Sequence, residues 1–100
     1  MGDDRHDSPR VFRMTNDAVP RLWKLARLDY DPVRQKHVLL YPEGAVLLND
    51  TGAAILELCN GSRTLGEIVT ILGERYHTDV SADVTEYLEQ MAARELVRDG

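Results

Sequence analysis

The first half of the chain places apolar and polar residues in short alternating runs, which is the pattern of β-strands. Between Leu22 and Tyr30 the apolar positions 26, 28 and 30 alternate with charged ones, as in a strand with one buried face. Asp31-Pro32 is typical of a turn, and the mainly apolar run Lys36–Tyr41 follows it. After the tight connection 42–44, where Gly44 can take a positive φ, Ala45–Leu48 is a third short run. These runs predict three antiparallel strands.

From Asn49 onwards, the apolar residues recur with the spacing of helices instead. Asn49 or Asp50 has the side chain to cap a first, short helix, and the pair Asn60-Gly61 is typical of a helix end. The buried side of this helix is expected to consist of Ile55, Leu56, Leu58 and Cys59.

Two longer helices follow. Thr64 and Glu67 form a capping box at the start of the second helix. Its apolar residues recur at i, i+3, i+4, i+7 and i+11, namely Leu65, Ile68, Val69, Leu72 and Tyr76. Asp79 or Ser81 caps the third helix. The apolar stripe of that helix consists of Val84, Tyr87, Leu88 and Met91.

The order of strands and then helices defines the expected fold class. We predict an α+β, winged-helix-like domain with a three-stranded antiparallel sheet followed by a three-helix bundle. Leu96-Val97, after the last helix, is expected to fold back on the core. One hundred residues make a single domain. Residues 1–16 are polar and without period, so we interpret them as a flexible N-terminal arm before a domain at 17–98.

The charge distribution changes the expectation for partners. Residues 1–40 carry eight basic and six acidic side chains, whereas residues 41–100 carry four and eleven. A winged helix that reads DNA needs a basic helix, but the third helix has Asp83, Glu86 and Glu89 before its first basic residue, Arg94. We therefore expect no nucleic-acid partner. No apolar run approaches the ~20 residues of a membrane span, and the charged N-terminus lacks a signal-peptide pattern, so a cytoplasmic location is expected.

The residues that usually perform chemistry are scattered. His6, His37 and His77 have no metal-ligand spacing, and the single cysteine, Cys59, lies among apolar helix positions, which favours a buried thiol. Glu43 stands in a turn without a second carboxylate beside it in the sequence. We therefore expect no metal, no cofactor and no enzymatic activity.

The third strand suggests peptide binding instead. A short strand at the edge of a sheet has free N–H and C=O groups that can pair with an extended segment. If the third helix lies alongside, Tyr87, Leu88 and Met91 can wall an apolar groove next to that edge. The same three residues are also typical of a helix packed into the core, and core packing fits Leu88 better than Tyr87. Arg27, Arg34 and Lys36 on the sheet form a small basic patch that suits an acidic peptide.

Several short motifs follow one another in a characteristic order. They are Arg27-Leu28, Asp31-Pro32-Val33-Arg34, Val38-Leu39-Leu40-x-Pro42-Glu43, Leu47-x-Asn49, Ile55-Leu56-x-Leu58-Cys59-x-Gly61-x-Arg63-Thr64, Glu67-Ile68-Val69, Tyr76 and Leu96-Val97. In this combination the chain resembles the PqqD family, small peptide-binding proteins of pyrroloquinoline quinone (PQQ) biosynthesis, over about residues 18–98. It departs from the family pattern at Asn60, where aspartate is common, and at Glu95, where glycine is common.

The resemblance implies a domain that binds the ribosomally made precursor peptide PqqA and presents it to the radical S-adenosylmethionine enzyme PqqE. In the family, the peptide adds as a strand to the third strand, against the third helix. Carried over to this chain, the backbone pairing is supplied by Ala45, Val46, Leu47 and Leu48. The groove is lined by Val84, Tyr87, Leu88 and Met91. An exposed sheet edge is compatible with a monomer or a homodimer.

Two other functions remain open from the sequence. One is a leader-peptide recognition domain of another modified-peptide pathway. The other, which the charge distribution disfavours, is a winged-helix DNA-binding regulator.

Overall fold

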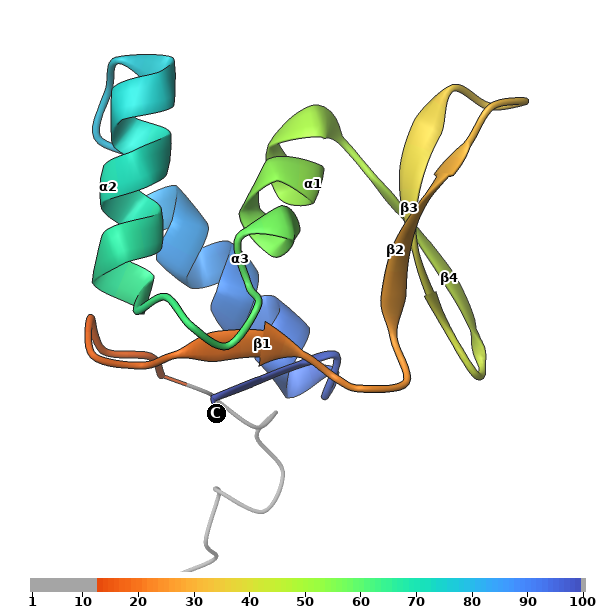
Figure 1. The fold of residues 1–100 in the computed structure, drawn as a ribbon, viewed down its shortest axis with the longest axis horizontal. Helices are drawn as coiled ribbons and strands as arrows, with labels where there is room; N and C mark the ends of the chain where they lie inside the picture. Colours follow the sequence, from red (N-terminus) through yellow and green to blue (C-terminus); the bar gives the residue numbers. More distant parts are fainter. Residues whose placement is uncertain (1–12, 100) are drawn as a thin grey trace, which may run out of the picture.

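The computed structural model describes residues 13–99. Its elements in chain order are β1 (Pro20–Leu22), β2 (Arg27–Asp31), β3 (Lys36–Tyr41), β4 (Gly44–Leu48), α1 (Asp50–Glu57), α2 (Leu65–Tyr76), α3 (Ser81–Ala93) and β5 (Val97–Asp99) (Figure 1). Strands β2, β3 and β4 form an antiparallel sheet in that order, and β1 pairs with β5 in a second, two-stranded sheet. The predicted α+β class, with a three-stranded antiparallel sheet and three helices, is confirmed.

The run between Leu22 and Tyr30, predicted as one strand, is divided between the two sheets. Strand β1 ends at Leu22 and β2 begins at Arg27. Between them the chain turns, and the Ala26 N–H donates to the Trp23 carbonyl at 2.8 Å. Apolar residues continue through this turn, so the hydrophobic pattern gave no sign of the break. The prediction of a continuous strand was wrong for this reason.

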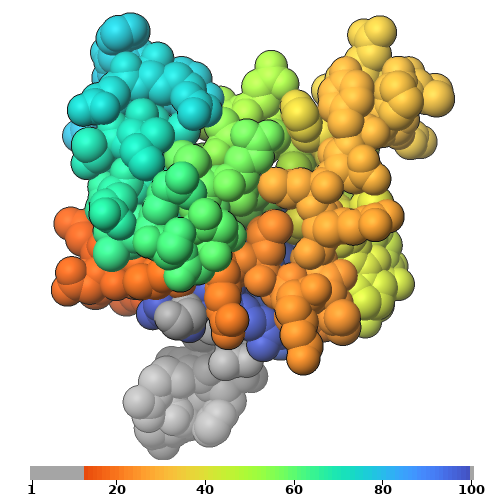
Figure 2. All heavy atoms as spheres, in the orientation of Figure 1, coloured from red at the N-terminus to blue at the C-terminus, as the bar shows by residue number. Residues whose placement is uncertain are grey.

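One face of the three-stranded sheet belongs to the core. Leu39 and Leu48 are 0% and 4% exposed and lie in the main hydrophobic cluster with residues of all three helices. Helix α1 lies between this sheet and α2, and β1 and β5 run below the helices in the view of Figure 1. The tip of the β2–β3 hairpin stands clear of the helices (Figure 2). Tyr30, predicted on the buried side of its strand, is therefore 48% exposed.

Predicted caps are confirmed at the first two helices. The Asn49 side chain accepts from the Gly52 N–H at 2.7 Å. Thr64 and Glu67 form the full capping box, with bonds of 3.1 Å and 2.8 Å. The N-cap of α3 is Val80 rather than Asp79 or Ser81.

Asp79, one residue before the N-cap Val80, nevertheless accepts a hydrogen bond from the first turn of α3. Its carboxylate accepts from the Ser81 N–H at 2.9 Å, and this bond lowers the pKa of Asp79. At the other end of α3, the predicted return of Leu96-Val97 to the core is confirmed, since these residues are 3% and 2% exposed.

Residues 1–12 of the predicted N-terminal arm lie outside the described residues. The residues that follow contact the helices. The Met14 N–H donates to Glu89 Oε2 at 2.8 Å, and the Gly66 N–H donates to the Asn16 carbonyl at 3.1 Å. The boundary between arm and domain stays a prediction. Within residues 13–99 no helix is long and apolar enough to cross a membrane.

The turn after α3 shows why glycine is common at position 95 in the pattern that this sequence resembles. Glu95 has a φ of 63°, a left-handed conformation that costs an L-residue about 1–2 kcal/mol. Glycine adopts it freely but loses more backbone freedom on folding. We expect Glu95→Gly to raise the free energy of unfolding by about 1 kcal/mol, measured by urea denaturation. Glu95→Ala removes the carboxylate but keeps the backbone penalty, so an equal gain from both variants would contradict this explanation.

Cys59 is buried, as the sequence predicted. It is 3% exposed, its Sγ donates to the Ile55 carbonyl at 3.3 Å, and burial raises its pKa to about 12 from an ordinary 9.0. The folded state thus favours the neutral thiol more than the unfolded state does. The contribution of this difference to the free energy of unfolding is fully present below pH 9.0 and is lost as the pH rises towards about 12.

We expect the free energy of unfolding to fall above pH 9, by up to about 1.4 kcal/mol per pH unit from this group. Denaturation at pH 8, 9 and 10 measures it. Cys59→Ala is the control and should decline less steeply. Parallel curves for the two proteins would show that the thiol does not contribute.

Candidate functional site

Strand β4 is the free edge of the three-stranded sheet. Tyr41 and Gly44 are paired across the two-residue loop between β3 and β4. The pair beside such a loop is hydrogen-bonded in both directions, and bonded and non-bonded pairs then alternate. Val46 and Leu48 therefore bond to β3, whereas Ala45 and Leu47 direct their N–H and C=O groups towards the free edge. The four predicted pairing residues thus divide into two that can bond to an added strand and two that hold β4 in the sheet.

The two sets also differ in the face that their side chains occupy. Leu48 belongs to the core cluster and Val46 packs against it. Ala45 and Leu47 project on the opposite face, where Leu47 is 52% exposed. A strand added to β4 consequently has one set of side chains towards the helices and the other set on the outer face of the sheet.

Two contacts relate α3 to the segments that flank β4. The Tyr87 hydroxyl lies against Gly52 in the first turn of α1, four residues after the end of β4, where a Cβ atom would be 2.8 Å from the hydroxyl oxygen. Near the start of β4, Arg94 Nη2 donates to the Tyr41 hydroxyl at 3.5 Å. Helix α3 therefore runs antiparallel to β4, with Tyr87 near one end of the strand and Arg94 near the other.

Most of the predicted groove residues of α3 lie in the core. Val84, Leu88 and Met91 are 1%, 0% and 6% exposed, whereas Tyr87 is half-buried. Whether the three buried residues contact a peptide stays a prediction. Of the predicted groove residues of α3, Tyr87 is the one whose side chain is partly exposed in the free protein.

The structure adds two polar residues to the side of α3 that carries Tyr87. Gln90 and Arg94 follow it at i+3 and i+7, so the three share one side of the helix, and both are exposed. Only the apolar positions of this helix were predicted to line the groove, so these two residues were missed. Their helical spacing from Tyr87 was the available signal.

Burial raises the pKa of Tyr87, the nearby Cys59 thiol raises it further, and Arg94 acts in the opposite direction. The phenol therefore stays protonated at neutral pH and can donate a hydrogen bond.

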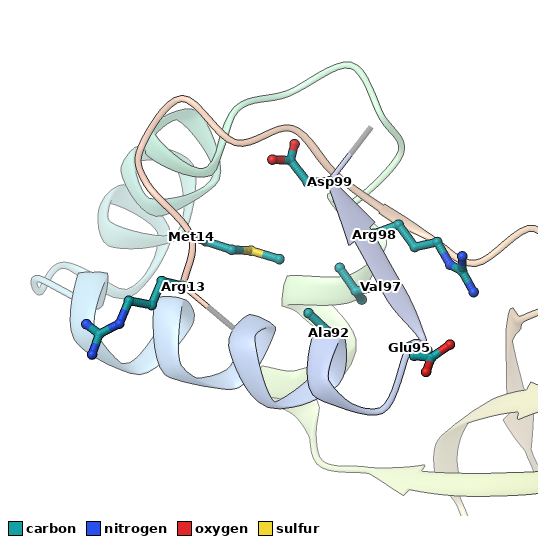
Figure 3. A pocket seen from close by; sticks show the side chains of 7 residues that line it. All are labelled: Arg13, Met14, Ala92, Glu95, Val97, Arg98 and Asp99. Carbon is teal, nitrogen blue, oxygen red and sulfur yellow. The ribbon is translucent and has the colours of Figure 1, made fainter. Parts of the chain in front are cut away.

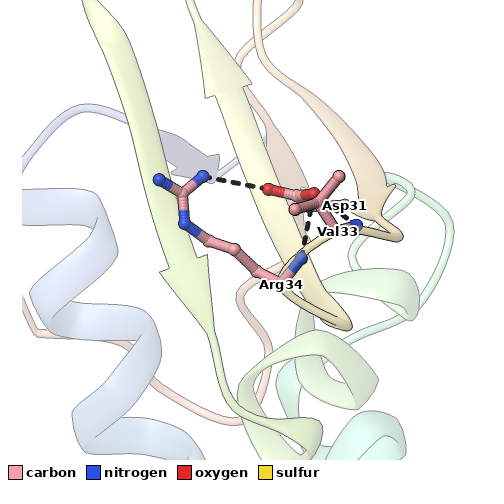
Figure 4. Close-up of polar contacts among 3 residues, drawn as sticks. All are labelled: Asp31, Val33 and Arg34. Atoms are coloured by element: carbon pink, nitrogen blue, oxygen red, sulfur yellow. Dashed lines mark hydrogen bonds and ion pairs between the residues drawn. The ribbon is translucent and has the colours of Figure 1, made fainter.

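The basic patch predicted on the sheet is partly neutralised. Asp31 Oδ1 accepts from the N–H groups of Val33 and Arg34 at 3.0 and 3.2 Å, and Asp31 Oδ2 pairs with Arg34 Nη1 at 3.0 Å (Figure 4). The Arg34 N–H, its guanidinium and then the Val33 N–H hold the pKa of Asp31 below its ordinary value. Arg34 thus stabilises the β2–β3 turn, and Arg27 and Lys36 remain as the basic residues of the patch.

Two hollows lie near the C-terminal end of α3. One of about 380 Å³ is formed by Arg13, Met14, Ala92, Glu95, Val97, Arg98 and Asp99 (Figure 3). The other, of about 190 Å³, adjoins the Tyr41–Arg94 contact and is formed by Trp23, Tyr41, Glu43, Arg94, Glu95, Leu96 and Arg98. Neither includes the predicted peptide-contact residues. Among residues 13–99, no three histidine, cysteine, aspartate or glutamate side chains are grouped to hold a metal ion.

A small winged-helix-like domain with a free strand edge beside its third helix defines a class of recognition domain. Comparison with known proteins gives the family. Residues 36–97 match the family Coenzyme PQQ synthesis protein D (PqqD), and the chain belongs to this family.

Relatives and a solved structure agree with this assignment. The chain is 39% identical over 84 residues to the PqqA binding protein of Methylococcus capsulatus, covering 83% of this chain and 90% of that protein. It is 43% identical over 77 residues to the PqqA binding protein of Azotobacter vinelandii, covering 75% and 84%.

The solved structure is the solution NMR structure of the PqqD part of Methylobacterium extorquens PqqCD. It superposes with a TM-score of 0.74 at 38% identity, over 85% of this chain and 94% of that one. That domain is described as a functional, stand-alone recognition element for ribosomally synthesized and post-translationally modified peptides.

Proposed function

We propose that this protein is a non-catalytic peptide chaperone of PQQ biosynthesis, which binds the PqqA precursor and presents it to the radical S-adenosylmethionine enzyme PqqE. Relatives that match most of its length are PqqA binding proteins. The proposal places it in the cytoplasm, where ribosomal precursor peptides are made.

The observation that carries the proposal is the direction of the backbone groups of Ala45 and Leu47. Both residues point an N–H and a C=O away from β3, so an extended peptide can form a fourth strand without displacing any element of the sheet. On α3, which runs antiparallel to β4, Tyr87, Gln90 and Arg94 share one side of the helix and would offer apolar, amide and cationic contacts to the peptide. Such groups bind and orient a substrate.

Isothermal titration of the full chain with synthetic Methylococcus capsulatus PqqA tests the binding step. Saturable binding at one peptide per chain is the expected result, and no heat change at high peptide excess would contradict it. The presentation step is tested separately, by assaying PqqE on PqqA with and without this protein. We expect cross-linked PqqA to accumulate faster when the protein is present.

The alternative function is recognition of a precursor peptide other than PqqA, and peptide titration distinguishes the two functions. The resemblance to a stand-alone recognition element is compatible with a different precursor. A small open reading frame encoding Glu-x-x-x-Tyr beside the gene favours PqqA, and a different precursor that binds in place of PqqA would favour the alternative.

A further inference from the structure

The face of the sheet turned away from the helices carries an apolar surface of its own. Register places Val38, Leu40, Ala45 and Leu47 on this outer face. None of them belongs to the core cluster of the described residues, whose sheet members all lie on the other face. Val38 is nevertheless only 7% exposed, because it lies in the central strand, opposite Leu47. The outer face is therefore an apolar shelf that continues to the free edge of β4.

Strand addition places part of the peptide on this shelf. Ala45 and Leu47 are the residues that bond towards the edge, and in an antiparallel ladder the residues opposite them project on the same face. Those peptide side chains consequently lie beside Ala45 and Leu47, on the outer face. The alternate peptide side chains lie beside Val46, between β4 and α3.

We propose that the outer face, through Leu47 backed by Val38 and Leu40, recognises apolar side chains at every second position of the bound strand. This inference rests on the proposed function. It identifies the ligand as an extended segment that is apolar on both faces, rather than one with a single apolar side directed at α3. An apolar peptide residue opposite Leu47 covers its exposed half, so that the register of the peptide depends on both faces of the sheet.

The position of the shelf supports this occupant over a separate partner. The shelf is continuous with the pairing edge, and the side chains of an added strand reach it without any other contact. Its charged neighbours are Arg27, Asp29 and Asp31 on β2, the strand farthest from the edge, and Lys36 at the start of the central strand β3. The part nearest the added strand is therefore apolar.

Titration of Leu47→Thr with synthetic Methylococcus capsulatus PqqA tests the inference. Threonine keeps the backbone N–H and suits a strand but lacks most of the apolar surface, so we expect binding to weaken about fivefold to tenfold. Val33→Thr makes a comparable change at a residue that is 91% exposed and far from the edge. This control should bind like the unmodified protein.

A second readout is independent of variant stability. Nuclear Overhauser effects between the Leu47 methyl groups and aliphatic or aromatic side chains of bound PqqA are expected. If Leu47→Thr binds as well as Val33→Thr and no such effects are seen, the outer-face inference is overturned while the chaperone function stands. If the unmodified protein does not bind PqqA, both are overturned.

Discussion

Leu47→Pro is expected to abolish PqqA binding while the domain remains folded. The Leu47 N–H points to the free edge of β4, so its loss removes a bond to the added strand and none within the sheet. Proline is tolerated at edge positions of this kind, and its ring adds a steric obstacle to pairing. Isothermal titration measures the affinity, and circular dichroism with urea denaturation measures the fold.

Val46→Pro is the matched control for this prediction. Val46 is one residue away but pairs with Leu39 in a hydrogen-bonded position. Proline there removes a bond of the sheet itself and should cost about 3 kcal/mol or more of stability, unfolding much of the protein. Normal PqqA binding by a folded Leu47→Pro variant would show that the peptide does not pair with this edge.

Leu88→Ala is expected to lower the free energy of unfolding by about 3 kcal/mol, and the affinity of its folded molecules for PqqA tests whether the buried stripe of α3 contacts the peptide. Leu88 is fully buried among the helices, and truncating a buried leucine costs about 2–5 kcal/mol. Urea denaturation measures the loss of stability. Because a small domain tolerates little loss, the binding comparison also uses Leu88→Met, which keeps the volume and costs less than about 1.5 kcal/mol.

Tyr87→Ala provides the contrast to Leu88. Tyr87 is half-buried beside the edge, so its truncation should weaken PqqA binding. A folded Leu88→Met protein that binds PqqA more weakly than Tyr87→Ala does would contradict the larger role expected for Tyr87 in peptide contact. It would favour a groove that opens into the α3 stripe.

The sequence predicted the helices well because their signals are local. A capping box at Thr64 and Glu67, and apolar residues at helical spacing behind it, depend only on residues within a few turns. The strands Lys36–Tyr41 and Ala45–Leu48 were likewise found from their own pattern, and their pairing followed from short connections. The edge position of β4 could therefore be anticipated.

Features that depend on contacts between distant segments were missed. The break before β2 exists because β1 pairs with β5 from the other end of the chain, and no local pattern reports that pairing. The sequence left open whether the apolar stripe of α3 faces a groove or the core, because the burial of that stripe depends on what packs against it. A positive φ was anticipated at Gly44 but occurs at Gln35, Gly61, His77 and Glu95, and at Glu95 the chain turns back to place Leu96 in the core.

Hydrogen exchange at the amides of Ala45 and Leu47, followed by NMR with and without PqqA, tests the central claim most directly. In the free protein these two N–H groups face the open edge, and the amides of Val46 and Leu48 are bonded within the sheet. We predict that PqqA slows exchange at Ala45 and Leu47 and leaves Val46 and Leu48 little changed. PqqA binding that leaves Ala45 and Leu47 unprotected and protects another surface would contradict the account.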